Sequence, residues 1–158
     1  MKRKQLIAGL LLLLVPFFVF ATPDLVLKDF NGKDRNINEF IGKGKWVAVM
    51  IWAHDCHICN QEVHQMTFFH DEHKDKDAIV LGVSIDGMEQ IDKAREFIKR
   101  NSVNFPNLIA EPEHEVLIKF GGGPFFGTPT FYIYNPAGDL VAKNIGPITG
   151  EDIERFMK

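Results

Sequence analysis

The sequence predicts a single α/β domain built on a mixed central β-sheet with helices on both faces. Two apolar segments rich in β-branched residues, 45–52 and 78–84, have the composition of buried strands. Each is followed by a segment in which apolar residues recur at helical spacing. Turn signals at Asn31-Gly32 and at residues 135–138 add a β-hairpin at the N-terminus and another near the C-terminus. This order of strands and helices is typical of a mixed sheet covered on both sides.

The first half of the domain is expected to hold the N-terminal hairpin and the first strand–helix unit. Its predicted elements are strands at 24–30 and 33–37, a helical turn at 38–41, a strand at 45–52 and a helix from 56 to about 73. Four apolar residues indicate the helix, because their spacing places them on one face: Cys59, Val63, Met66 and Phe69. We expect the side-chain oxygen of Asp55 to cap this helix.

The second half repeats the strand–helix unit and ends with a hairpin and a helix. Its predicted elements are strands at 78–84, 105–109, 130–134 and 140–145, and helices at 88–101, 113–120 and 151–157. The helix at 88–101 has an apolar face of Ile91, Ala94, Phe97 and Ile98. Three consecutive glycines from residue 121 are expected to end the helix at 113–120.

The first 21 residues predict a secretory signal. Basic residues at 2–4 precede an apolar run from Leu6 to Phe20, which is shorter than the roughly 20 residues that span a bilayer. Pro16 interrupts the run, and Val19-Phe20-Ala21 offers a cleavage site after Ala21. An uncleaved membrane anchor is the alternative. Either way we expect residues 22–158 to form a domain outside the cytoplasm, periplasmic or otherwise extracytoplasmic, and membrane-anchored if the signal is kept.

The charge of the predicted mature chain excludes some partners. The signal holds three of the 18 basic residues and none of the 21 acidic ones, which leaves a formal net charge of −6. This negative charge argues against nucleic acid and against an anionic membrane surface as partners.

The only two cysteines, Cys56 and Cys59, lie two residues apart where the strand at 45–52 gives way to a helix. Backbone N–H groups at the start of a helix favour an anion, so a thiolate at Cys56 would be stabilised there. A thiolate attacks disulfides, and Cys59, one turn further on, can displace the resulting mixed disulfide. The spacing therefore predicts a redox pair. A structural disulfide and half of a zinc site are the alternatives, but the chain has no second cysteine pair for zinc.

The order of motifs resembles the thioredoxin fold, and within it the secreted TlpA-like and ResA-like thiol-disulfide oxidoreductases. The resemblance covers about residues 25–157. It rests on five motifs: Trp52-Ala53 before Cys56-His57-Ile58-Cys59, Val83-Ser84-Ile85-Asp86, Asn104-Phe105-Pro106, Gly127-Thr128-Pro129-Thr130-Phe131, and Asn135-Pro136-Ala137-Gly138.

The resemblance implies a role for each matching position. Cys56 is the attacking thiol and Cys59 the resolving thiol, and the two form the redox disulfide. Thr128 precedes a cis peptide bond to Pro129, which presents the Thr128 backbone to a substrate chain. Trp52, beside the motif, is also expected to bind substrate. An ordinary trans proline at the start of a strand is the alternative at Pro129.

Two further residues are expected to tune protonation. Glu62, three residues after Cys59, would be a partly buried carboxylate that raises the pKa of a neighbouring thiol and accepts its proton. A protonated His57 between the cysteines would stabilise a thiolate. The alternative for each is a solvated surface residue.

The sequence departs from the family pattern at three places. Asp55 stands where the family usually has an aromatic residue, and its negative charge opposes a thiolate at the next position. Met50 replaces the buried acid of cytoplasmic thioredoxins. Thr130 replaces a glutamate frequent in the cytochrome-maturation branch, which weakens an assignment to apocytochrome reduction.

The predicted function is that of an extracytoplasmic thiol-disulfide oxidoreductase, with reductase as the favoured direction. It needs no cofactor and no metal, because the two sulfurs carry both electrons. Its expected partners are protein thiols and disulfides, with a membrane-embedded electron donor. The sequence leaves the substrate protein, the donor and the reduction potential open.

Two alternative functions remain at this point. One is a copper carrier that uses both cysteines and a histidine, since thiolate and imidazole ligands suit copper; His70 and His73, three apart on the predicted helix, could also bind a metal. The other is a thiol peroxidase, which in the usual pattern has a threonine three residues before the nucleophile. Ala53 occupies that position and counts against it.

Overall fold

The computed structural model describes residues 22–158, and the predicted signal at 1–21 lies outside them. The described chain folds around a seven-stranded mixed sheet with the order β2-β1-β5-β4-β3-β6-β7. The strands are β1 (Val26–Asp29), β2 (Asp34–Asn36), β3 (Trp46–Trp52), β4 (Ala78–Ser84), β5 (Asn107–Ile109), β6 (Thr130–Tyr134) and β7 (Leu140–Ile145). The predicted fold class is confirmed.

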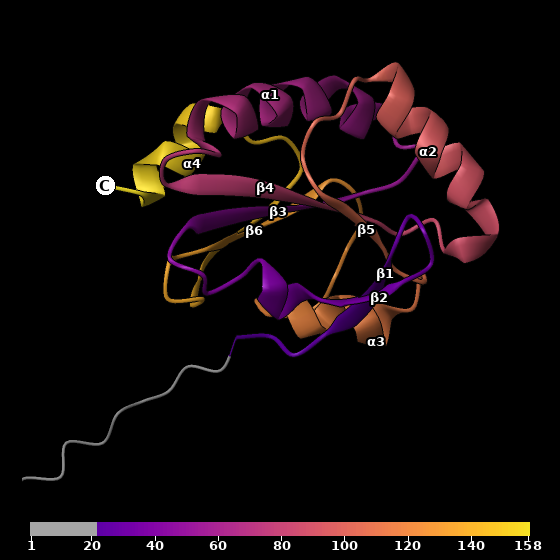
Figure 1. The fold of residues 1–158 in the computed structure, drawn as a ribbon, viewed down its shortest axis with the longest axis horizontal. Helices are drawn as coiled ribbons and strands as arrows, with labels where there is room; N and C mark the ends of the chain where they lie inside the picture. The colour runs from indigo at the N-terminus through magenta and orange to yellow at the C-terminus, as the bar shows by residue number, and fades with distance from the viewer. Residues whose placement is uncertain (1–21) are drawn as a thin grey trace, which may run out of the picture.

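Helices cover both faces of the sheet. On one face lie α1 (His57–His73), α2 (Ile91–Arg100) and α4 (Gly150–Phe156); the other carries α3 (His114–Leu117), which continues as a 3₁₀ turn to Phe120 (Figure 1). A 3₁₀ turn at Ile37–Glu39 joins α3 on that second face. Within the part of the chain that the structure describes, no helix is long and apolar enough to cross a membrane.

Strand β3 is buried on both faces, which explains its unbroken apolar sequence. Because side chains alternate along a strand, Ala48 and Met50 pack under α1 and α2, whereas Val47 and Val49 pack toward the opposite face. The buried face of α1 is the one predicted, with all four of its apolar residues in the core.

The register of the sheet sets which residues meet at its functional edge. β3 and β4 run parallel and both end at the same level, with Trp52 opposite Ser84. β6 runs antiparallel to β3, with Thr130 opposite Ile51. The chain leaving β3 and the chain entering β6 therefore pass side by side.

Trp52 lies inside the core rather than on the surface. It is 1% exposed, its ring stacks on that of Phe97 at a centroid distance of 4.3 Å, and its Nε1–H donates to Asn107 Oδ1 at 3.0 Å. Gly82 of β4 leaves the space for that amide, because a Cβ at residue 82 would lie 1.9 Å from Asn107 Oδ1. A substrate contact by the Trp52 side chain does not fit this burial, and that expectation is corrected to a packing role.

The predicted elements are present, with differences at their ends. The strands at 78–84, 130–134 and 140–145 have the predicted bounds, and the N-terminal hairpin pairs β1 with β2. The predicted helix at 88–101 begins instead with a 3₁₀ turn, Met88–Gln90, after Gly87 with its φ of 69°. Strand β5 is shorter than predicted because it starts after Pro106, which has no N–H to donate to a neighbouring strand.

Candidate functional site: the cysteine pair at the start of α1

The cysteine pair lies at the N-terminus of α1, directly after the loop that leaves β3. Cys56, not Asp55, is the N-cap residue, so the predicted cap is wrong by one position. The Cys56 sulfur accepts the backbone N–H of Cys59 at 3.1 Å, which puts sulfur in the place that a capping oxygen usually takes. An anionic sulfur at this position would be stabilised by that N–H and by the helix dipole.

The two sulfurs differ in access. They are joined in a disulfide, with a Cα–Cα distance of 5.2 Å. Cys59 is 0% exposed, whereas Cys56 is partly exposed. A partner's thiol or disulfide can therefore reach only the Cys56 sulfur, which agrees with Cys56 as the attacking residue and Cys59 as the resolving one.

Glu62 lies one turn after Cys59 on α1 and is partly buried. Its Oε2 is buried and, among residues 22–158, has no hydrogen-bond partner. A buried oxygen without a donor is unusual, since leaving such a group unpaired costs about 1–3 kcal/mol. The carboxylate expected near the resolving thiol is therefore present and partly buried, and its role as a base stays a prediction.

The Thr128–Pro129 peptide bond is cis, as predicted. It immediately precedes β6, and the pairing of Thr130 with Ile51 brings it alongside the chain that runs from β3 to Cys56. Thr128 is partly exposed, whereas Pro129 is buried, and the Pro129 carbonyl accepts the N–H of Gly146 at 2.9 Å. The Thr128 backbone therefore lies at the edge where a substrate strand would have to approach.

His57 is exposed on the first turn of α1, and the structure gives it no hydrogen bond or ion pair with another described residue. It directly follows Cys56 in the sequence. Its proposed effect on the thiolate remains a prediction.

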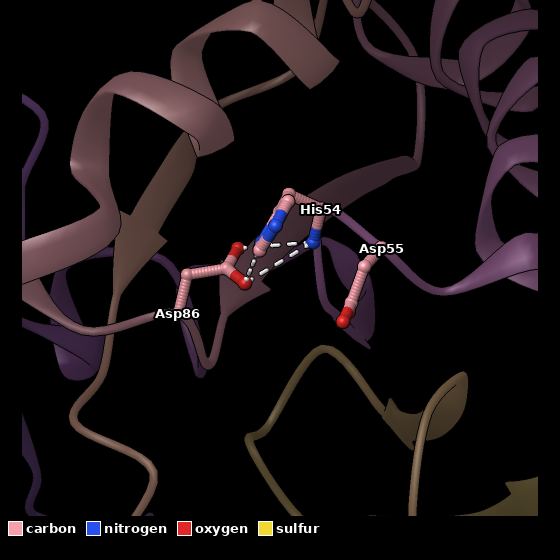
Figure 2. Close-up of side chains that lie close together, drawn as sticks. All are labelled: His54, Asp55 and Asp86. Carbon is pink, nitrogen blue, oxygen red and sulfur yellow. Dashed lines mark hydrogen bonds and ion pairs between the residues drawn. The ribbon is translucent and has the colours of Figure 1, made fainter.

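Sequence reasoning missed a second histidine beside the pair (Figure 2). His54 Nδ1 lies 2.6 Å from Asp86 Oδ1, and the His54 backbone N–H donates to the same carboxylate. The contact follows from strand register, because each residue stands two positions after the end of its strand, and β3 and β4 end opposite one another.

A polar network also anchors the cysteine turn to α2. Asn60 Nδ2 donates to the Cys56 carbonyl at 3.0 Å. Arg100 donates to Asn60 Oδ1 at 2.9 Å and to the His54 carbonyl at 3.1 Å, and Asn101 Nδ2 donates to Asn60 Oδ1 at 3.2 Å. The motif is therefore held from α2 as well as from its own helix.

The two helix histidines considered for metal binding do not share a site. His70 is buried and its Nδ1 accepts the backbone N–H of Val80 at 3.1 Å, whereas His73 Nδ1 contacts Asp77 at 2.8 Å. In the described residues two other groups have ligand-type atoms close enough to hold an ion. They are His54, Asp55 and Asp86, and Glu72, His73 and Glu154. In the first group His54 and Asp86 already bind one another, so hydrogen bonding accounts for their arrangement.

Comparison with known proteins places this site in a family. The sequence matches the AhpC/TSA family over residues 21–143. The chain belongs to the AhpC/TSA family. It is 27% identical over 136 residues to the thiol-disulfide oxidoreductase ResA of Geobacillus kaustophilus, covering 86% of this chain and 74% of that protein. It is 29% identical over 135 residues to ResA of Bacillus subtilis, covering 85% of this chain and 71% of that protein.

Solved structures share the fold of this AhpC/TSA-family chain. StoA from Bacillus subtilis matches with a TM-score of 0.66 and 23% identity, covering 87% of this chain and 96% of that one. A thiol:disulfide interchange protein of the thioredoxin family from Chlorobium tepidum matches with a TM-score of 0.70 and 21% identity, covering 85% and 90%. The predicted resemblance to ResA-like thiol-disulfide oxidoreductases of the thioredoxin superfamily is confirmed.

Proposed function

We propose that this thiol-disulfide oxidoreductase reduces disulfides of other proteins outside the cytoplasm. The observation that carries the proposal is the asymmetric cysteine pair: one partly exposed sulfur caps α1, and its partner sulfur is fully buried behind it. The ResA relatives share the thiol-disulfide oxidoreductase name, and the apolar start of the chain supports delivery across a membrane.

The reaction proceeds in two exchanges. The Cys56 thiolate attacks one sulfur of a substrate disulfide; a Cys56–substrate disulfide forms, and the other substrate sulfur leaves as a thiolate that takes up a proton. Cys59 then gives its proton to Glu62, and its thiolate attacks the Cys56 sulfur. The second substrate thiolate is released and the internal disulfide is formed. Two electrons pass from the pair to the substrate.

The remaining residues position the substrate and tune charge. The exposed backbone of Thr128 would pair with an extended substrate segment next to Cys56, because an open edge of backbone groups accepts an added strand. A protonated His57 would favour the Cys56 thiolate. No cofactor takes part, since the sulfurs carry both electrons. Resetting the pair requires a dithiol reductant, for which we propose a membrane-embedded electron donor.

The direct test is reduction of a protein disulfide such as that of insulin, with dithiothreitol as the reductant. We expect Cys56→Ser to lower the catalysed rate by at least about a thousandfold, because the nucleophile is gone. Cys59→Ser, produced in cells without added reductant, should instead accumulate a stable Cys56–substrate disulfide, whose isolation identifies the substrate. Equal rates for Cys56→Ser and the wild type would contradict the proposal.

The direction and location are tested separately. Equilibration with a redox buffer should give a potential nearer the roughly −270 mV of a strong thiol reductant than the roughly −120 mV of a strong oxidant. A potential of roughly −120 mV would overturn the reductase direction.

Mass analysis of the exported protein tests its location. It should find an N-terminus at Thr22, and a retained leader would show an anchored form.

The copper-carrier alternative finds no support in the site or in the relatives. The two cysteines that would bind the ion are bonded to each other, and the ResA relatives are named as oxidoreductases. The peroxidase alternative requires a threonine hydroxyl three residues before Cys56, and buried Ala53 occupies that position.

A further inference from the structure

The loop that leads into Cys56 contains a histidine whose ring is fixed by a buried aspartate (Figure 2). The side chain of Asp86 is 4% exposed and that of His54 is 19% exposed, and their closest atoms, Nδ1 and Oδ1, are 2.6 Å apart. The Ser84 hydroxyl donates to the other Asp86 oxygen at 2.5 Å. Two consecutive links, Ser84 to Asp86 and Asp86 to His54, thus join the end of β4 to the residue two positions before Cys56.

These contacts decide which ring nitrogen of His54 holds a fixed hydrogen. Asp86 accepts from the Ser84 hydroxyl and from the His54 backbone N–H, at 3.2 and 3.1 Å for its two oxygens. An ionised carboxylate only accepts hydrogen bonds, so Nδ1 must donate to it. The second proton of His54 is therefore gained and lost at Nε2, the arrangement by which a buried aspartate orients a histidine for proton transfer.

The charge on this histidine matters because its surroundings are acidic. A carboxylate oxygen of Asp55 lies within 4.8 Å of both a ring nitrogen of His54 and an oxygen of Asp86. The positively charged Arg100 donates to the His54 carbonyl at 3.1 Å, and its other hydrogen bonds go to Asn60. With a neutral ring, the His54–Asp55–Asp86 cluster carries two negative charges; with a protonated ring it carries one.

We propose that His54, positioned by Asp86 and Ser84, sets the pH dependence of Cys56 by changing the negative charge of the loop that leads into it. A protonated ring reduces the repulsion that Asp55 and Asp86 exert on a thiolate, and the effect disappears when the ring loses its proton. The inference rests on the proposed function, because the charge has a consequence only if Cys56 exchanges as a thiolate. It assigns Asp86 and Ser84 as positioning residues and adds no redox step.

The test measures alkylation of Cys56 by iodoacetamide between pH 4.5 and 9 in Cys59→Ser, which leaves a single thiol. We expect the rate profile of this parent to contain two ionisations, one from the thiol and one from a histidine. Adding His54→Gln should remove the histidine step. It should lower the rate about threefold to tenfold at pH 5.5 and leave the rate at pH 8.5 within about twofold, because the proposed charge effect belongs to the acid side of the profile.

A matched control separates this effect from histidine loss in general. His64 is exposed on α1, the helix that follows the His54 loop, and the described residues offer its side chain no hydrogen bond or ion pair. His64→Gln should keep both ionisations. If His54→Gln and His64→Gln give the same profile, the proposal is overturned while the proposed function stands. If the parent shows no enhanced alkylation and the wild type reduces no insulin, the proposed function fails instead.

A second measurement needs no folded variant of His54. Ring ¹⁵N spectra of the reduced wild-type protein should show His54 with hydrogen fixed on Nδ1 when neutral, and the Cys56 signal should shift as His54 titrates. Asp86→Asn removes one of the two negative charges and should weaken the histidine step in the alkylation profile. The proposal would also be refuted if the neutral His54 ring had its hydrogen on Nε2, or if the Cys56 signal did not shift as His54 titrates.

Discussion

Both ends of α1 contain histidines, and the two ends use their polar side chains in opposite ways. At the N-terminal end, Cys56 caps the helix with its sulfur, and His57 stands exposed beside it. At the C-terminal end, His70 is buried and accepts the N–H of Val80, while His73 stacks on Phe69 at a ring distance of 4.4 Å. The first end keeps its polar groups available. The second end pairs His70 Nδ1 and His73 Nδ1 within the fold, although His73 Nε2 is buried without a hydrogen bond among the described residues.

The difference shows that position on the helix, rather than residue type, decides between chemistry and structure. The start of a helix presents unpaired N–H groups that favour an anion. The last turn of α1 instead packs against β4 and α4, so its histidines serve as acceptors and ion-pair partners. Changes at the first end should alter activity with little loss of stability, and changes at the second should do the reverse.

Of the substitutions that compare the two ends of α1, Glu62→Gln, near the cysteine pair, should have the largest effect. Without the carboxylate the Cys59 proton has no acceptor, so the mixed disulfide should resolve about ten- to a hundredfold more slowly at pH 7. Stopped-flow decay of the mixed disulfide measures this step. Glu72→Gln, an exposed glutamate on the same helix, is the control. Equal decay rates in the two variants would return Glu62 to the surface-residue interpretation.

At the structural end, His70→Leu should reduce the free energy of unfolding by about 1–3 kcal/mol. The substitution leaves the buried N–H of Val80 without its acceptor. Urea unfolding monitored by circular dichroism gives the value, with His64→Leu as the exposed control. Disulfide reduction per folded molecule should stay unchanged; a large loss of activity would break the separation between the two ends.

The same residue predicts how stability depends on pH. Burial lowers the pKa of His70, and the nearby positive charge of Lys74 lowers it further. The unfolded chain keeps a pKa near 6.5 and so binds the proton first as pH falls. The contribution of His70 should therefore be complete above about pH 6.5 and decrease below it. Unfolding at pH 7.5, 6.5 and 5.5 should show this slope in the wild type and a weaker one in His70→Leu.

The smallest effect is expected from His73→Gln. His73 Nδ1 contacts Asp77 at 2.8 Å and Nε2 lies 3.5 Å from Glu154 on α4. Ion pairs with exposed carboxylates contribute little, so the loss should be about 0.5–1 kcal/mol, mostly from the aromatic stacking on Phe69. A calorimetric melt detects it. A change in insulin reduction would contradict a purely structural role.

Much of the fold could be predicted because its central strands are buried on both faces. A continuous apolar run of seven residues such as Ala78–Ser84 is typical of a strand buried on both faces. Side-chain alternation would also have shown that Trp52 shares a face with Met50 and points under the helices. The helix cap was missed because Asp55 and Cys56 can both accept an N–H, and the pattern does not say which backbone leaves the helical conformation.

The parts of the site that could not be predicted depend on contacts between distant segments. The cysteines are local in sequence, so their location was evident. The bond from His54 to Asp86 spans 32 residues and follows from strand register, which periodicity does not reveal. The buried, unpaired oxygen of Glu62 likewise depends on what packs around α1, so the sequence could suggest the residue but not its environment.

Residue 82 must be glycine, because there is no space for a side chain at this position of β4. Even one methyl group there would displace the Asn107 amide, and the indole N–H of Trp52 would lose its only described acceptor. Three adjacent strands share that space directly behind the redox loop. Saturation mutagenesis should accordingly find this backbone site intolerant of every replacement, although it touches no sulfur and faces no substrate.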